Sequence, residues 1–136
     1  MVARGYRKIA EDGFTLVELM IVMLVIAVLL GLAVPKYTSS VRQAKEAVLK
    51  EDLHVLRGAI DAYTVDKQKA PASLDELVSA GYLKALPEDP FTRRSDSWQP
   101  VVTDTLRSID QTEPGIDDVH SGSTESSSDG QPYASW

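Results

Sequence analysis

The sequence contains no cysteine, which excludes a disulfide framework, a thiolate metal site and a thiol nucleophile. Histidine occurs only at His54 and His120, and their spacing matches no zinc-binding motif. The sequence also lacks a phosphate-binding glycine loop and a serine nucleophile elbow. We therefore expect no enzyme. With 136 residues, the chain is of a size typical of a single domain.

Positive charge is scarce in the second half of the chain. Residues 71–136 hold four Lys or Arg against twelve Asp or Glu, a formal charge of -8, whereas the whole chain carries -6. So acidic a surface repels phosphate backbones, and no basic stripe with interleaved aromatic residues is present in the sequence. We expect no binding of nucleic acid by the monomer.

One long apolar run dominates the first half of the chain. Its 21 residues, 14–34, contain a single charge, at Glu18, and as a helix would be about 31 Å long, enough to span a bilayer core of about 30 Å. The roughly 100 remaining residues could hardly surround a helix that is apolar on every face, so a buried core helix is a poor alternative. The run is also too long for a secretory signal peptide, and Pro35-Lys36-Tyr37 is a poor cleavage site.

An amphipathic helix is predicted beyond Pro35. Apolar residues spaced four, three, four and three apart predict one buried stripe, which comprises Leu49, Leu53, Leu56, Ile60 and Tyr63. An adjoining apolar stripe extends it backward through Val41, Ala44 and Val48. Gly58 is the only helix breaker between residues 37 and 67, so this helix and the apolar run can form one continuous helix.

The rest of the chain predicts a small α+β domain. The helix should stop near Pro71, and a second, short helix should begin at Ser73, because Ser73 and Glu76 have the spacing of a capping box, and end at Gly81. Short strands are expected over 98–103 and 116–120. The expected fold is α+β: a long N-terminal α-helix, transmembrane in one half and amphipathic in the other, packed on a small C-terminal domain with a short helix and a few short antiparallel strands.

The C-terminal region is rich in oxygen-bearing side chains. Residues 121–130 would be called a flexible loop from their serine content. Asp117, Asp118 and Asp129 are carboxylates of the kind that Ca²⁺ requires, and serine and glycine residues lie between them. They are candidate calcium ligands, and no other cofactor is expected. The alternative is an open loop with hydrated acids, anchored by apolar burial of two aromatic residues, Tyr133 and Trp136.

Glu18 is the most informative residue of the apolar run. An isolated charge near the centre of a bilayer costs about 2.5–3.5 kcal/mol, and less near the interface, so Glu18 needs either a partner or an interfacial position. If the chain were cut between Gly13 and Phe14, a new α-ammonium would lie at the depth of Glu18 in a neighbouring, staggered copy. The two charges would then neutralise each other.

The segment from Gly13 to Val22, GFTLVELMIV, resembles the class III signal of type IV pilins and type II secretion pseudopilins. The resemblance implies that a prepilin peptidase cuts after Gly13 and methylates Phe14, and that Glu18 is the fifth mature residue. Up to about residue 91 the chain is similar to the major pseudopilin, the G subunit. The end of the chain resembles family members in which an acidic loop before a final Trp binds calcium, although the second acidic cluster is reduced here to Asp129.

The same resemblance implies a division of the chain and a location. Residues 1–13 would be the leader peptide, 14–35 the transmembrane and filament-core segment, and 36–136 a periplasmic pseudopilin domain. Within that domain we expect an amphipathic helix over 36–69, followed by a variable loop and C-terminal region over 70–136. The protein is expected in the bacterial inner membrane as a single-pass chain with a cytoplasmic N-terminus, and after assembly in a periplasmic or cell-surface filament. Three basic residues lie on either side of the span, so charge does not decide its orientation. We take the orientation from the resemblance.

The implied function is that of a structural subunit in a pilus-like filament for type II protein secretion. The alternative within the family is a type IV pilin for adhesion, motility or DNA uptake. Expected partners are further copies of the chain, the prepilin peptidase, the inner-membrane assembly platform, minor pseudopilins, and the membrane before assembly. Outside the family, a monomeric anchored binding module and an anchored enzyme are the rival hypotheses.

Overall fold

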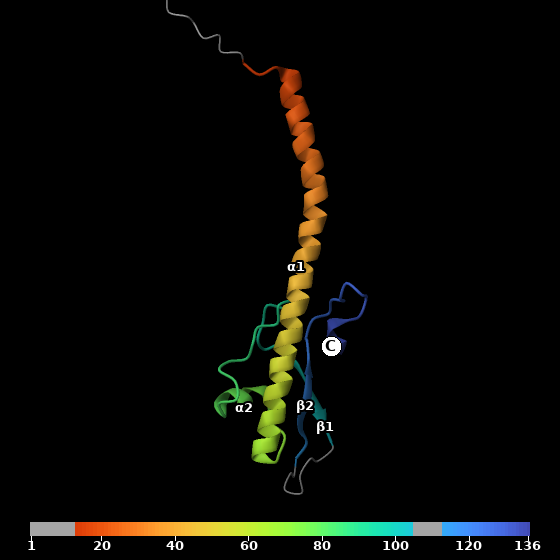
Figure 1. The fold of residues 1–136 in the computed structure, drawn as a ribbon. Helices are drawn as coiled ribbons and strands as arrows, with labels where there is room; N and C mark the ends of the chain where they lie inside the picture. Colours follow the sequence, from red (N-terminus) through yellow and green to blue (C-terminus); the bar gives the residue numbers. More distant parts are fainter. Residues whose placement is uncertain (1–12, 105–112) are drawn as a thin grey trace, which may run out of the picture. The chain divides into compact units, whose positions relative to one another are not determined.

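The computed structural model describes residues 13–104 and 113–136. The chain divides into two units, Met1–Ser39 and Ser40–Trp136, which are described separately below. The elements follow the order α1, α2, β1, β2 and a final 3-10 turn, η1 (Figure 1). The predicted α+β fold is confirmed.

Helix α1, Leu16–Lys67, begins in the first unit and ends in the second. Its start is fixed by Thr15, whose hydroxyl accepts a hydrogen bond from the Glu18 backbone N–H at 3.2 Å. Pro35 lies inside the helix without ending it, and the Thr38 hydroxyl donates to the Pro35 carbonyl at 3.0 Å. One continuous helix was predicted over both halves, and α1 confirms it. It ends two residues before the expected limit at residue 69.

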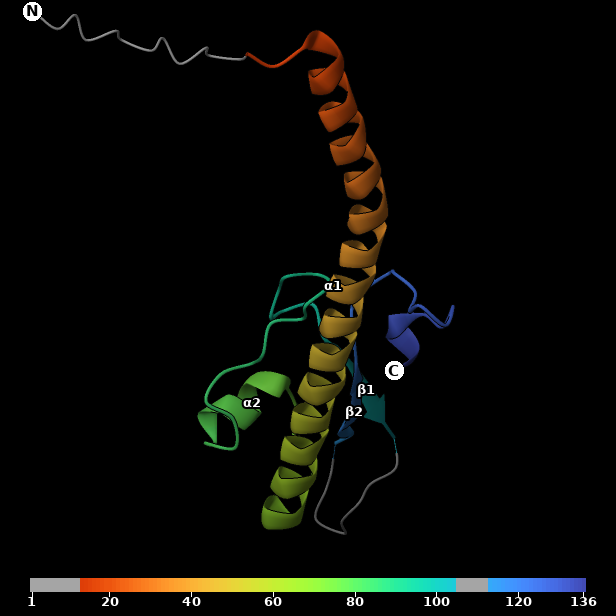
Figure 2. The ribbon, with the colours of Figure 1, turned by 45° about the horizontal axis from the view of Figure 1, so that its top comes forward.

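Helix α2, Leu74–Ser79, starts where the capping box predicts. The Ser73 hydroxyl accepts from the Glu76 N–H at 3.3 Å, while the Glu76 carboxylate accepts from the Ala72 N–H at 2.8 Å. Gly81 has a φ of +86°, a left-handed conformation that glycine adopts without steric cost. Within the second unit, α2 lies on one side of α1 and the two strands on the other (Figures 1 and 2).

Strands β1, Gln99–Thr103, and β2, Gly115–His120, form an antiparallel pair. Both strands were predicted to within one residue. The register shifts between Val101 and Val102, so that Asp117 is the extra residue of a bulge in β2.

The core of the second unit forms where one face of α1 meets α2, β2 and the end of the chain. All five residues of the predicted stripe, from Leu49 to Tyr63, are buried. They share the core with residues from the other elements, which include Leu77, Trp98, Ile116, Val119 and Tyr133. Val41, Ala44 and Val48, which extend an adjoining stripe backward, are exposed.

Candidate functional site

The peptide bond between Gly13 and Phe14 lies in an exposed part of the chain without regular secondary structure. Residues 13–15 precede α1, and the Phe14 side chain is 81% exposed. No heavy atom outside the neighbouring residues lies within 4 Å of the place a Gly13 Cβ would occupy. Exposed, non-helical chain is the preferred substrate of peptidases. This conformation suits the predicted cut, which stays a prediction.

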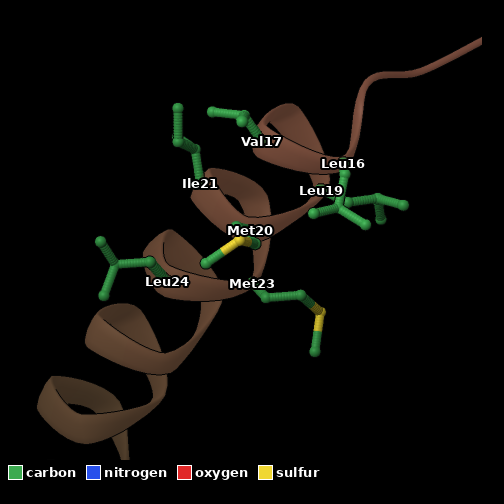
Figure 3. Close-up of a pocket in the computed structure, with 7 residues that line it drawn as sticks. All are labelled: Leu16, Val17, Leu19, Met20, Ile21, Met23 and Leu24. Carbon is green, nitrogen blue, oxygen red and sulfur yellow. The ribbon is translucent and has the colours of Figure 1, made fainter.

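The segment Phe14–Val34 has no core of its own. Every large apolar side chain in it is exposed, from 45% at Ile26 to 81% at Phe14. Among the described residues, α1 is the helix long and apolar enough to cross a membrane, by length and composition. Figure 3 shows the side chains near its start pointing outward in several directions. Only lipid or other protein chains would remove this surface from water.

Glu18 lies in the first turn of α1. Its N–H is capped by Thr15, and Thr15 and Glu18 have the T-x-x-E spacing of a capping box. A carboxylate in this position also interacts favourably with the helix dipole, by about 0.3–1 kcal/mol at an exposed site. The role of Thr15 was missed in the sequence, although the spacing signal was present. The pairing of Glu18 with a neighbouring chain stays a prediction.

The three candidate calcium ligands lie in different surroundings in the structure. Asp118 accepts a hydrogen bond from Arg57 Nε at 2.6 Å, and Asp117 accepts one from the Thr103 hydroxyl at 3.5 Å. Asp129 is exposed, and its own N–H bonds the Ser127 hydroxyl at 3.3 Å. Within residues 13–104 and 113–136 there is no group of three or more His, Cys, Asp or Glu side chains that could hold a metal ion. The three carboxylates thus do not form such a group, and calcium binding by them stays a prediction.

Arg57 supplies a positive charge to this part of the domain. Besides Asp118, its guanidinium donates to the backbone carbonyls of Val119 at 3.1 Å and Trp136 at 2.8 Å. Burial raises the pKa of the Asp118 carboxyl, but the Arg57 hydrogen bond, the Val119 N–H and nearby positive charge outweigh it, so the net pKa is lowered. Arg57 thus holds strand β2 and the end of the chain to α1, a role that its sequence position did not indicate.

The serine-rich segment packs against the domain instead of forming the open loop that its composition suggests. Ser121, Ser123 and Ser127 are buried. The Ser121 hydroxyl donates to the fully buried Asp89 at 2.5 Å, and the Ser121 and Ser123 hydroxyls each accept from an N–H two residues further on. The described part of the chain holds no buried side-chain polar atom without a hydrogen-bond partner. Side-chain hydroxyls thus satisfy the backbone here without regular secondary structure.

Two further contacts hold the tail to the same helix. The Glu46 carboxylate accepts from the Ser128 N–H at 3.0 Å and from the Tyr133 hydroxyl at 2.8 Å. Tyr133 stacks on Phe91 with ring centroids 4.0 Å apart, and Trp136 meets the Tyr133 ring edge-on at 5.1 Å. The expectation that the two tail aromatics dock against the domain is confirmed.

Comparison with known proteins identifies the same N-terminal segment. Residues 10–34 match the family model described as the prokaryotic N-terminal methylation motif. This match covers Gly13, Phe14 and Glu18. No solved structure matches the chain.

Several curated proteins are similar over a longer stretch. The type II secretion system core protein G of Pseudomonas aeruginosa is 35% identical, over 60% of this chain and 68% of that protein. The core protein G of Klebsiella pneumoniae is also 35% identical, over 60% and 69%. The competence protein ComGC of Halalkalibacterium halodurans is 36% identical, over 54% and 72%. With the methylation motif near its start and relatives that match 60% of its length, the chain belongs to the family of type IV pilins and type II secretion pseudopilins.

Proposed function

We propose that the protein is the structural subunit of a type II secretion pseudopilus, acting by assembly and not by catalysis. The observation that carries this proposal is the fully exposed apolar segment Phe14–Val34, directly after an exposed, non-helical Gly13–Phe14 bond. A chain with such a segment is stable in two surroundings, a lipid bilayer and a bundle of like segments. Transfer from the first to the second is polymerisation out of the membrane.

Processing prepares the chain for this transfer. A prepilin peptidase cuts after Gly13 and methylates the new N-terminus at Phe14, and an inner-membrane assembly platform with minor pseudopilins receives the product. The precursor is a single-pass inner-membrane protein with a cytoplasmic N-terminus, and the filament grows into the periplasm. The motif over residues 10–34 and the single apolar helix support this course.

Glu18 guides the register of the subunits in this proposal. Its carboxylate pairs with the Phe14 ammonium of an adjacent copy in a medium of low dielectric constant, where opposite charges attract far more strongly than in water. The position of Glu18 in the first turn, four residues from Phe14, supports the pairing. Its backbone contribution to the helix start does not depend on the carboxylate, because Thr15 caps the N–H of residue 18.

The test is filament yield from cells that contain the assembly machinery. Glu18→Ala should still insert, since it removes a charge from the apolar segment, but filaments should fall by about tenfold or more, the effect of losing about 1.4 kcal/mol per subunit contact. Glu18→Gln keeps the size and removes the charge, so it should behave like Glu18→Ala. A normal filament yield from cells in which either variant is the only form of the protein would indicate that Glu18 merely lies near the membrane interface.

A second candidate function is that of a competence pilin for DNA uptake, favoured by the similarity to ComGC. Deleting the gene separates the two. Loss of protein secretion with normal transformation supports the pseudopilus, and loss of transformation with normal secretion supports the competence pilus. A strain that keeps both activities would contradict both assignments.

A further inference from the structure

A groove opens on the surface of the unit Ser40–Trp136, lined by residues of α2, of both strands and of the chain between them. Its volume is about 340 Å³, at the lower end of the range for ligand sites. We call it the β1 groove. Its apolar lining includes three buried core side chains, a half-buried leucine and two exposed residues of β1, which are respectively Leu74, Trp98 and Ile116, then Leu86, then Pro100 and Val102.

One face of β1 leads from the core into this groove. Trp98 directly precedes the strand, and Trp98, Pro100 and Val102 alternate in the sequence and line the same groove, so they share one face. Trp98 is 4% exposed, whereas Val102 is 55% exposed. The domain thus covers the start of this apolar face and leaves its end open to solvent.

The outer edge of β1 is open as well. The sheet has two strands, and β1 pairs with β2 on one side, so its other side has no strand partner among the described residues. Such an edge presents backbone N–H and C=O groups with which an extended peptide can pair. Pro100 lacks an N–H and weakens the edge as a general pairing site. Side chains in the groove must therefore supply part of the affinity and the specificity.

The charge around the groove indicates which peptide fits. The charged side chains in its described lining, Asp75 and Asp96, are both acidic and exposed. Asp96 is paired with Arg94 at 2.7 Å, whereas Asp75 has no ion-pair partner within residues 13–104 and 113–136. Because residues 71–136 carry a formal charge of -8, a second copy would bring like charge to the groove, and a basic segment would bring opposite charge.

We propose that the β1 groove binds an extended segment of another protein, in which apolar side chains are flanked by lysine or arginine. The segment adds to the open edge of β1, its apolar side chains lie beside Pro100 and Val102, and a flanking cation reaches Asp75. The inference goes beyond the proposed filament function and does not depend on it. In a filament, it gives each subunit a binding site for a protein other than its own copies.

Peptide binding to the full-length protein in neutral detergent micelles tests the ligand. The probe is a fluorescent seven-residue peptide with blocked ends, in which lysine alternates with valine, phenylalanine and valine. We expect saturable binding by fluorescence anisotropy below about 1 mM peptide. Replacing the lysines by glutamate, or the apolar residues by serine, should weaken binding by about tenfold or more, because either change removes one of the two kinds of contact. No saturable binding of the lysine peptide, or equal binding of either control peptide, would overturn the proposal.

Substitutions on the two faces of β1 test the location. Val102→Lys puts a cation in the groove and should weaken binding of the lysine peptide by about tenfold or more. Val101→Lys is the matched control, since Val101 is the exposed neighbour on the opposite face and gains the same charge; it should remain within about threefold of the unaltered protein. Asp75→Asn should weaken binding by about threefold or more. Equal effects of the two lysine substitutions would overturn the proposal. Filament assembly does not enter these measurements, so their failure leaves the proposed function intact.

Discussion

Replacing Arg57 by methionine should destabilise the domain by about 2 kcal/mol, a loss that arises from its three hydrogen bonds. The pair with Asp118 is more than a third exposed on both sides, at 38% and 39%, so it contributes only about 0.5–1 kcal/mol. The bonds to the carbonyls of Val119 and Trp136 contribute about 0.5–1.5 kcal/mol each. Methionine keeps an apolar stem about as long as that of arginine up to Nε, and loses all three bonds.

The assay is thermal denaturation of a fragment covering residues 40–136, which contains the second unit and its core. For a domain of about 100 residues, 2 kcal/mol corresponds to a fall in melting temperature of roughly 8–16 °C. Arg57→Lys keeps the charge but lacks the planar fork, so it should lose about half as much stability. A change below about 0.5 kcal/mol for Arg57→Met would refute the role assigned to this residue.

The same contact predicts a dependence on pH. The pKa of Asp118 is lower in the folded domain than its usual value of 3.8. A carboxyl with a lowered folded pKa stabilises the domain above the unfolded pKa, and this stabilisation is lost as the pH falls through the folded value. The difference in stability between the unaltered fragment and Asp118→Asn should therefore be present at pH 6 and shrink below about pH 4. An unchanged difference at pH 2.5 would contradict the ion pair.

Three more predictions concern the same fragment. Gly122→Ala should destabilise it by about 2–3 kcal/mol, because the added Cβ would lie 1.9 Å from the backbone carbonyl oxygen of Ser97, and wild-type stability would contradict this packing. Ser121→Ala should cost about 2 kcal/mol, since it leaves the buried Asp89 carboxylate without one partner; a loss below about 0.5 kcal/mol would argue against that bond. Millimolar calcium should raise the melting temperature above the value measured with a chelator if Asp117, Asp118 and Asp129 help to bind the ion, and equal melting temperatures would contradict that site.

The helices marked by a local pattern of residues were predictable from the sequence. The core face of α1 follows a spacing of three and four, and α2 follows from the capping pair Ser73 and Glu76. In both cases the residues that cooperate lie within a few positions of one another.

The contacts that hold the tail were not predictable in this way. Arg57 and Asp118 are 61 residues apart, and Asp89 and Ser121 are 32 apart. No local period links such residues, and in the sequence Arg57 is one of many charges on a helix. The exposure of Val41, Ala44 and Val48 was not predictable either, because apolar spacing alone does not show whether the domain covers a face of the helix.

The central claim is that a processed chain polymerises through Phe14–Val34. Intact-mass spectrometry of protein taken from purified filaments tests it most directly. The account predicts a chain that has lost 13 of its 136 residues, starts at Phe14 and carries one added methyl group. Filaments built from chains that retain residues 1–13 would contradict it.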